Sequence, residues 1–204
     1  MGLRLGIFGG SFDPVHYGHL LLAECCREQA SLDRVRFIPA AVSPHKIGAE
    51  PVSAEDRVEM LKLAVGGHEF FEVSTSEIDR GGVSYTVDTM ATLRAEDADR
   101  ELFFLMGADS LFDFPSWKQP DEICRLCTPV VVSRPGSPAP DFSVLKDIVK
   151  PERLAEIEKQ AVQMPQIDIS STEIRERARD GRSFRFQTPR AVEKYIQTKE
   201  LYKA

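Results

Sequence analysis

The sequence predicts an α/β fold in which a doubly wound parallel sheet carries helices on both faces. Short apolar, β-competent runs alternate along the chain with longer stretches of helical periodicity. This alternation is typical of parallel sheets, because a crossover helix must connect each strand to the next one. The run 102–106 is apolar throughout, as expected of a strand that is buried on both faces.

The predicted strands are apolar or β-branched runs that end at glycine, proline or a polar turn. They span residues 3–8, 34–39, 70–78, 101–106, 129–133 and 166–169. Glycine, proline and polar residues follow these runs, so the loops at one edge of the sheet are expected to be rich in turn-forming residues. The proline-containing segment 40–52 and the aromatic segment 112–117 are predicted as loops.

The predicted helices begin at capping residues and carry apolar positions every three or four residues. They span 14–30, 53–65, 87–95, 121–127, 170–179 and 189–202, with a broken helix over 143–161. Tyr195 and Tyr202, near the end of the chain, are expected to be packing residues. No linker or repeat divides the sequence, so residues 1–204 are expected to form a single domain whose part from about residue 170 is helical.

The most informative stretch runs from Gly9 to Leu20. Gly9-Gly10 ends the first strand, and Asp13 is expected to cap a helix that starts at Pro14. The free N–H groups of a helix start after a glycine turn favour a phosphate. His16 and His19 are three residues apart, so on a helix they share one face beside that site. A tight turn with two surface histidines is the alternative for either feature taken alone.

A second polar stretch, Ser170 to Arg175, also stands at a predicted helix start. Its hydroxyls and the guanidinium one turn later would make another anion cradle. The alternative is a plain serine cap with Arg175 paired to a surface acid. Because the carboxyl ends of parallel strands meet at one edge, both stretches are expected to face the same crevice.

The composition of the chain limits which classes of partner and which cellular compartment are expected. With 26 Lys and Arg against 32 Asp and Glu, the net charge of −6 argues against a nucleic-acid binder but leaves room for a small basic pocket. The start is not a signal peptide and no apolar run is long enough to cross a membrane, so no membrane partner is expected. Cys25, Cys26, Cys124 and Cys127 are expected to be reduced thiols of a cytoplasmic protein, and no metal site is predicted.

The two stretches resemble the signatures of a known superfamily. Gly10 to His19 resembles the His-x-Gly-His motif of the nucleotidylyltransferases, and Ser170 to Arg175 resembles their Ser-Ser-Thr-x-x-Arg motif. Glycine-rich fingerprints of dehydrogenases and P-loop enzymes are absent from the sequence. Further stretches resemble the bacterial nicotinate mononucleotide adenylyltransferases: 43–46, 82–89, 104–109, 117–118, 132–136 and the end of the chain from 188.

This resemblance implies a Rossmann-like nucleotidylyltransferase domain that transfers AMP from ATP to nicotinate mononucleotide. The products are deamido-NAD and pyrophosphate, in NAD biosynthesis, without a covalent intermediate. Three alternatives stay open: a pantetheine-phosphate adenylyltransferase, an enzyme that prefers nicotinamide mononucleotide, and a nucleotide-binding module without turnover. The first of these usually carries Thr where His16 stands. The oligomeric state also stays open, a homo-oligomer included.

The resemblance also implies residue roles. The expected catalytic residues are His16, His19 and Arg175. The ATP site is expected to comprise Gly9, Gly10, Ser11, Phe12, His16, His19, Lys46, Gly107, Asp109, Ser171, Thr172 and Arg175. The mononucleotide site is expected to comprise Ser84, Tyr85, Thr86, Trp117 and Arg134. Mg²⁺ is expected to be held mainly by ATP oxygens and water. Lys118 stands where some relatives carry Tyr, and its charge favours an acid over an amide.

Overall fold

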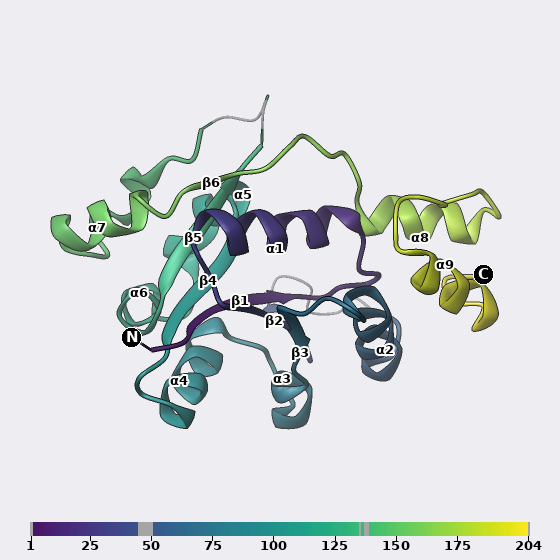
Figure 1. The fold of residues 1–204 in the computed structure, drawn as a ribbon, viewed down its shortest axis with the longest axis horizontal. Coiled ribbons are helices and arrows are strands. Elements are labelled where there is room, and N and C mark those ends of the chain that lie inside the picture. The colour runs from purple at the N-terminus through teal and green to yellow at the C-terminus, as the bar shows by residue number, and fades with distance from the viewer. Residues whose placement is uncertain (1, 45–50, 135, 137–138, 204) are drawn as a thin grey trace.

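The computed structural model describes residues 2–44, 51–134, 136 and 139–203. Its centre is a six-stranded sheet in the order β3-β2-β1-β4-β5-β6 (Figure 1). Every pair of neighbouring strands is parallel. The strands are β1 Arg4–Gly10, β2 Arg34–Pro39, β3 Phe71–Val73, β4 Glu101–Gly107, β5 Thr128–Ser133 and β6 Val162–Gln163. The predicted doubly wound α/β fold is confirmed, and the strand order reverses between β1 and β4.

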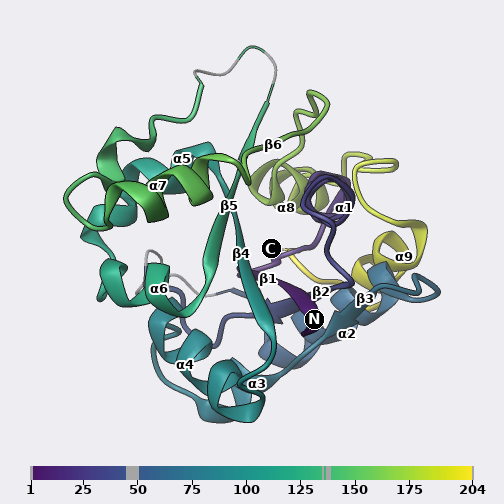
Figure 2. The ribbon, with the colours of Figure 1, turned by 60° about the vertical axis from the view of Figure 1, so that its left-hand side comes forward.

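Helices cover both faces of this sheet (Figures 1 and 2). They are α1 Tyr17–Gln29, α2 Ala54–Val65, α3 Ser76–Arg80, α4 Thr86–Glu96, α5 Ala108–Asp113, α6 Pro120–Leu126, α7 Pro151–Glu158, α8 Ser171–Arg179 and α9 Arg190–Thr198. The described part of the chain also contains the 3₁₀ turns η2 Phe114–Ser116 and η3 Phe142–Leu145. Side chains of α1, α2, α8 and α9 pack into one core cluster, and those of α4, α5, α6 and α7 into another.

The two core clusters divide the sheet residues by their alternation along each strand. On β4, Phe103 and Leu105 join the cluster under α1, whereas Leu102, Phe104 and Met106 join the cluster under α4. The predicted burial of this strand on both faces is therefore confirmed. Each fully buried side chain of this size stabilises the fold by about 2 kcal/mol.

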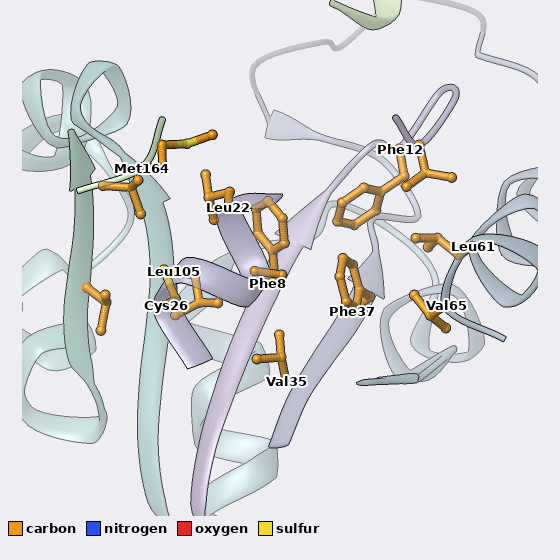
Figure 3. Packing of buried hydrophobic residues seen from close by; sticks show 14 of the residues in the cluster. Phe8, Phe12, Leu22, Cys26, Val35, Phe37, Leu61, Val65, Leu105 and Met164 are labelled. Carbon is orange, nitrogen blue, oxygen red and sulfur yellow. The ribbon is translucent and has the colours of Figure 1, made fainter. Parts of the chain in front are cut away.

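The aromatic centre of the first cluster lies close to the first loop of the chain. Figure 3 shows Phe8 and Phe12 pointing toward Phe37, with ring centroids 5.5 and 5.8 Å from that of Phe37. Phe12 belongs to the β1–α1 loop rather than to a strand, and its side chain is 2% exposed. The loop is thus anchored in the core by an aromatic ring.

Several predicted boundaries are wrong. Residues 74–78 are not strand, because the Thr75 hydroxyl donates to the Asp79 carboxylate (2.7 Å) and the chain turns into α3. The last strand is β6 rather than 166–169. The Gln29 side chain donates to the Gln163 carbonyl (2.7 Å) and accepts from the N–H of Gln163 (3.1 Å), which completes the exposed edge there. The aromatic segment 112–117 is mainly α5 and η2, not loop.

The four cysteines form no disulfide, and three of them are buried. Burial raises the pKa of the Cys124 thiol to about 11, so this thiol is an unreactive core group. Within the described part of the chain, no helix is both long enough and apolar enough to span a bilayer.

Candidate active site

Two adjoining cavities open where the strand order reverses. The larger, about 450 Å³, is lined by the carboxyl ends of β1 and β4 and by residues around Tyr85 and Trp117. The smaller, about 200 Å³, is lined by Ser11, Asp13, Arg57, Thr172 and Arg175 among others. Ala40 and Ser43 line both, so the two cavities are neighbours. A crevice at this point of a doubly wound sheet is the expected ligand site.

The two histidines stand at the start of α1. His16 is the N-cap, in extended conformation (φ −145°, ψ 171°), and His19 lies one turn into the helix. Their rings stack, with centroids 3.7 Å apart and planes at 24°. The backbone N–H of His16 donates to Nδ1 of His19 (3.3 Å). Because Nδ1 accepts, the neutral ring of His19 carries its proton on Nε2, which is then the donor nitrogen.

Gly18 lies between the two histidines, and its lack of a side chain leaves space for the His16 ring. A Cβ at this position would lie 3.0 Å from both Nδ1 and Cε1 of His16. Contacts that short require the imidazole to shift. The glycine of the His-x-Gly-His motif is therefore needed for the placement of His16 rather than for an unusual backbone angle.

His16 is held in its neutral form. It is 7% exposed, and burial together with the nearby charge of Arg134 lowers its pKa to about 4. Its Nδ1 is buried and makes no hydrogen bond to any residue that the structure describes. Arg134 stands at the carboxyl end of β5, outside the residues that line the larger cavity. Its charge thus reaches the histidine side of the crevice.

Asp13 does not cap α1, which corrects the predicted helix start. Asp13 and Pro14 form a turn, the helix starts only after His16, and the carboxylate of Asp13 is buried instead. There it is 6% exposed and accepts from the phenol of Tyr202 at 2.7 Å. The expectation that Tyr202 and Tyr195 are packing residues is incomplete. Both pack against the core, and the Tyr195 hydroxyl also donates to Asp56 (2.8 Å).

The start of α8 is joined directly to the histidine loop. Ser170 caps the helix by accepting from the N–H of Glu173 (3.1 Å). The Ser171 hydroxyl donates to the carbonyl of Pro14 (2.9 Å), and Nη1 of Arg175 donates to the carbonyl of Asp13 (2.7 Å). Two motifs about 150 residues apart in sequence thus form one surface.

Nη2 of Arg175 donates to the Thr172 hydroxyl (3.2 Å), and both side chains line the smaller cavity. This cavity therefore holds a guanidinium and a hydroxyl beside the amino end of α8. These are groups that suit an anion.

The larger cavity combines aromatic walls with polar ends. Trp117 lies edge-on to Phe104 (5.8 Å between centroids, 72°) and tilted against Phe114 (5.3 Å, 43°). Thr86 is the first residue of α4, so its N–H belongs to a helix start that faces this space. The Ser84 hydroxyl accepts from the N–H of Ala41 (2.9 Å) and fixes the loop after β2 against the cavity.

Two charged residues line the larger cavity. Nζ of Lys118 lies 3.0 Å from the Asp88 carboxylate and 4.6 Å from the centre of the Tyr85 ring. Glu77 is buried, and its carboxylate accepts from the Thr89 hydroxyl (2.6 Å). The cavity thus has a cation at the Trp117 end and a hydrogen-bonded acid in its wall.

Comparison with known proteins identifies the family. Residues 7–177 match the model of the cytidylyltransferase-like family. The chain belongs to this family. It is 46% identical to a probable nicotinate-nucleotide adenylyltransferase of Roseiflexus sp., with 98% of each chain covered. It is 44% identical to one of Thermus thermophilus, over 98% of this chain and 100% of the relative. These findings confirm the resemblance carried by the two motifs.

Solved structures agree on the fold of this cytidylyltransferase-like chain. One is the Plasmodium falciparum nicotinic acid mononucleotide adenylyltransferase complexed with NaAD, with a TM-score of 0.76, 16% identity and coverage of 98% and 97% of the two chains. Another is a putative nicotinate-nucleotide adenylyltransferase from Vibrio parahaemolyticus, with a TM-score of 0.70, 17% identity and coverage of 98% and 96%. At such identities the likeness concerns the fold.

In this family member, the residues expected to bind ATP fall into several groups. Gly9, Gly10 and Gly107 line the larger cavity, and Ser11 lines the smaller one. Asp109 is exposed in the first turn of α5, and its carboxylate lies close to where a Cβ on Gly107 would stand. Phe12 packs edge-on to His19 (5.2 Å, 73°) and so supports the histidine from the core side. Lys46 lies outside the described residues.

Sequence reasoning missed Arg57, which is 2% exposed. Its Nη1 donates to the carbonyls of Ser11 (3.0 Å) and Ala40 (2.8 Å) and so ties the loops after β1 and β2 together. Burial lowers its pKa, and the charge of Asp13 opposes that shift. One signal was available: Arg57 falls four residues before Leu61 on the apolar stripe of α2, where a charge needs a buried partner.

Proposed function

We propose that this protein transfers the adenylyl group of ATP to nicotinate mononucleotide, which yields deamido-NAD and pyrophosphate for NAD biosynthesis. The observation that carries the proposal is the joining of two anion-binding elements beside an aromatic cavity. The His16–His19 loop and the start of α8 are linked by Ser171 and Arg175, next to the space that Trp117 lines. Relatives that are 41–46% identical carry this activity in their names.

In this reaction the protein has to position the two substrates and stabilise negative charge on their phosphates. A phosphate oxygen of the mononucleotide attacks the α-phosphorus of ATP, and the bond from that phosphorus to the bridging oxygen breaks. Pyrophosphate leaves with the bonding electron pair. The attacking phosphate is already ionised at neutral pH, so no general base is needed. Catalysis then rests on alignment of the two phosphates and on stabilisation of the developing charge.

On the ATP side, His19 and Arg175 are the direct donors in this proposal. His19 donates through Nε2–H in this proposal, because its Nδ1 already accepts from the backbone of His16. Arg175 and Thr172 hold the leaving pyrophosphate at the amino end of α8. The Ser171 hydroxyl is committed to Pro14, so Ser171 contributes its backbone N–H and the placement of the loop.

His16 has a different part. It is neutral before ATP binds, because burial and Arg134 lower its pKa to about 4. Triphosphate charge next to the ring opposes both effects and favours a proton on it. His16 then serves as a hydrogen-bonding partner whose charge responds to the nucleotide. Arg134 supplies fixed positive charge on the same side of the crevice.

The mononucleotide occupies the larger cavity in this proposal. The pyridine ring stacks on Trp117, whose orientation is fixed by Phe104 and Phe114. The nicotinate carboxylate lies toward the start of α4, where the N–H of Thr86 is available to a ligand. Ser84 and Tyr85 shape that end of the cavity. Lys118 adds a cation there, which favours the acid over the amide.

Mg²⁺ belongs to the substrate in this proposal. Within the residues that the structure describes, no group of three or more His, Cys, Asp or Glu side chains could hold a metal ion. The ion would therefore enter as MgATP, bound by phosphate oxygens and water. When bound, it neutralises phosphate charge alongside Arg175 and the histidines.

The proposal is tested by pyrophosphate release from MgATP with nicotinate mononucleotide, nicotinamide mononucleotide or phosphopantetheine as acceptor. The highest kcat/KM is expected with nicotinate mononucleotide. Faster turnover of phosphopantetheine would replace the proposal by the pantetheine-phosphate alternative. Absence of pyrophosphate with all three acceptors would leave a nucleotide-binding module.

A further inference from the structure

The end of the chain reaches the loop that carries the catalytic histidines. We propose that Tyr202 is a positioning residue of this active site, which holds the β1–α1 loop in its working shape through the carboxylate of Asp13. The inference rests on the proposed function for its activity readout. It assigns a catalytic consequence to a C-terminal residue that lies 189 positions from Asp13 in the sequence.

The contact itself is short and buried. The Tyr202 hydroxyl donates to Oδ1 of Asp13 at 2.7 Å, and Asp13 is only 6% exposed. The pKa of Tyr202 is raised, by burial first and then by the charge of Asp13, so the phenol keeps its proton and remains a donor. Asp13 lies three residues before His16. A shift of Asp13 is therefore transmitted through Pro14 and Val15 to the N-cap of α1.

The loop needs such outside support, because its carbonyls have side-chain donors instead of a regular ladder. Four of them accept from side chains of distant elements: Ser11 from Arg57, Asp13 from Arg175, Pro14 from Ser171 and Val15 from Thr188. Tyr202 adds a bond to the side chain of the same loop. Backbone whose carbonyls are bonded to side chains of other segments gains alternative conformations when one of these bonds is lost.

Asp13 is also held by the charge of a neighbouring side chain. The guanidinium of Arg57 is close enough for its charge to interact with both Asp13 and Tyr202. Arg175 donates to the carbonyl of Asp13 while Tyr202 donates to its carboxylate. Asp13 is thus held at two atoms, one by a substrate-binding residue and one by the chain end. Loss of the phenol donor would leave a buried carboxylate with one bond fewer.

The chain offers a matched control in Tyr195. Its hydroxyl donates to Oδ1 of Asp56 at 2.8 Å, a bond of the same chemistry in the same C-terminal region. Asp56 lies in the first turn of α2, where Ser53 donates to it, and not on the histidine loop. Tyr195→Phe and Tyr202→Phe therefore each delete one phenol–carboxylate bond and keep the ring. Leu201 still packs against the core in both variants.

The experiment compares the steady-state kinetics and thermal midpoints of wild type, Tyr202→Phe, Tyr195→Phe and the double variant. We expect Tyr202→Phe to lower kcat roughly tenfold while the KM for nicotinate mononucleotide changes little, because the histidines rather than the Trp117 cavity are displaced. Both single variants should lower the thermal midpoint, but Tyr195→Phe should leave kcat unchanged. The double variant should then show the kcat of Tyr202→Phe alone.

Rescue at the other partner separates positioning from folding. Asp13→Asn keeps an acceptor oxygen for Tyr202 and should retain more kcat than Asp13→Ala. In the Asp13→Ala background, Tyr202→Phe should have no further effect on kcat. An unchanged kcat in Tyr202→Phe, or an equal loss in Tyr195→Phe, would overturn the inference while wild-type turnover upholds the proposed function. Failure of the wild type itself would refute the function instead.

Discussion

The imidazole rings of His16 and His19 lie face to face, 3.7 Å apart between centroids. At this separation two protonated rings would repel each other strongly, so the pair is suited to neutral rings in the absence of the proposed polyphosphate ligand. The stacking also explains why the motif separates its histidines by two residues. N-cap and third helical position bring the rings onto one face, and the backbone of His16 then sets the tautomer of His19.

Removal of the His19 imidazole should affect the chemical step most. We expect His19→Ala to lower kcat by on the order of 10²–10³, the usual loss for one donor that stabilises transition-state charge. The KM for nicotinate mononucleotide should change little, because His19 does not line the Trp117 cavity. Steady-state pyrophosphate release measures both quantities. A kcat near that of the wild type would show that the charge is stabilised elsewhere.

A methyl group at Gly18 should displace His16 without weakening the fold. Gly18→Ala places Cβ 3.0 Å from the His16 ring, so we expect kcat to fall roughly 10- to 100-fold. Helix propensity favours alanine by about 1 kcal/mol, so the thermal midpoint should not drop in proportion. In a His16→Ala background, Gly18→Ala should not lower kcat any further. An equal loss in both backgrounds would place the effect of Gly18 outside the histidine pair.

The lowered pKa of His16 predicts a stability change with pH. The unfolded chain takes up a proton near pH 6.5, whereas the folded chain resists it until about pH 4. The free energy of unfolding should therefore fall as the pH drops through this window, by about 3 kcal/mol in total. Urea unfolding of wild type and His16→Asn at pH 7 and pH 4.5 measures the difference. Parallel losses in the two proteins would exclude His16 as the source.

The proposed stacking of the substrate's pyridine ring on Trp117 predicts a substrate-specific defect. Trp117→Ala should raise the KM for nicotinate mononucleotide by roughly five- to tenfold and leave the KM for ATP nearly unchanged, since loss of an aromatic partner costs about 1–1.5 kcal/mol. Trp117→Phe keeps a ring against Phe104 and should retain most of the affinity. Equal effects on both substrates would contradict a stacking role.

Lys118 should tune selectivity between acid and amide. Lys118→Met removes the cation beside Tyr85 and should reduce the kcat/KM ratio of nicotinate over nicotinamide mononucleotide by roughly tenfold, or about 1.4 kcal/mol. Asp88→Asn releases the lysine from its ion pair and should shift the ratio the other way. Because the pair is half-exposed, both effects should weaken with added salt. If neither substitution changes this kcat/KM ratio, selectivity arises instead from the backbone N–H of Thr86.

Local patterns were sufficient to predict most strands of the sheet and the crevice where the strand order reverses. Alternation of strands and helices, the buried run of β4 and the cap at Ser170 depend on residues near one another in sequence. The same holds for the two motifs, since each is read within a dozen residues. The order of strands from β3 to β6 is that of a doubly wound sheet, the class that the alternation predicts. Family membership could therefore be expected before any coordinates were available.

Tertiary structure decided what holds the site in shape. Asp13 would cap a helix on local preference alone, but the phenol of Tyr202, 189 residues away, offers its carboxylate a buried donor. Arg57 likewise depends on carbonyls from two loops that only the folded sheet brings together. Sequence patterns record short-range sterics and burial periodicity. Hydrogen bonds between distant segments depend on where the packed core places their donors and acceptors, so only the fold determines them.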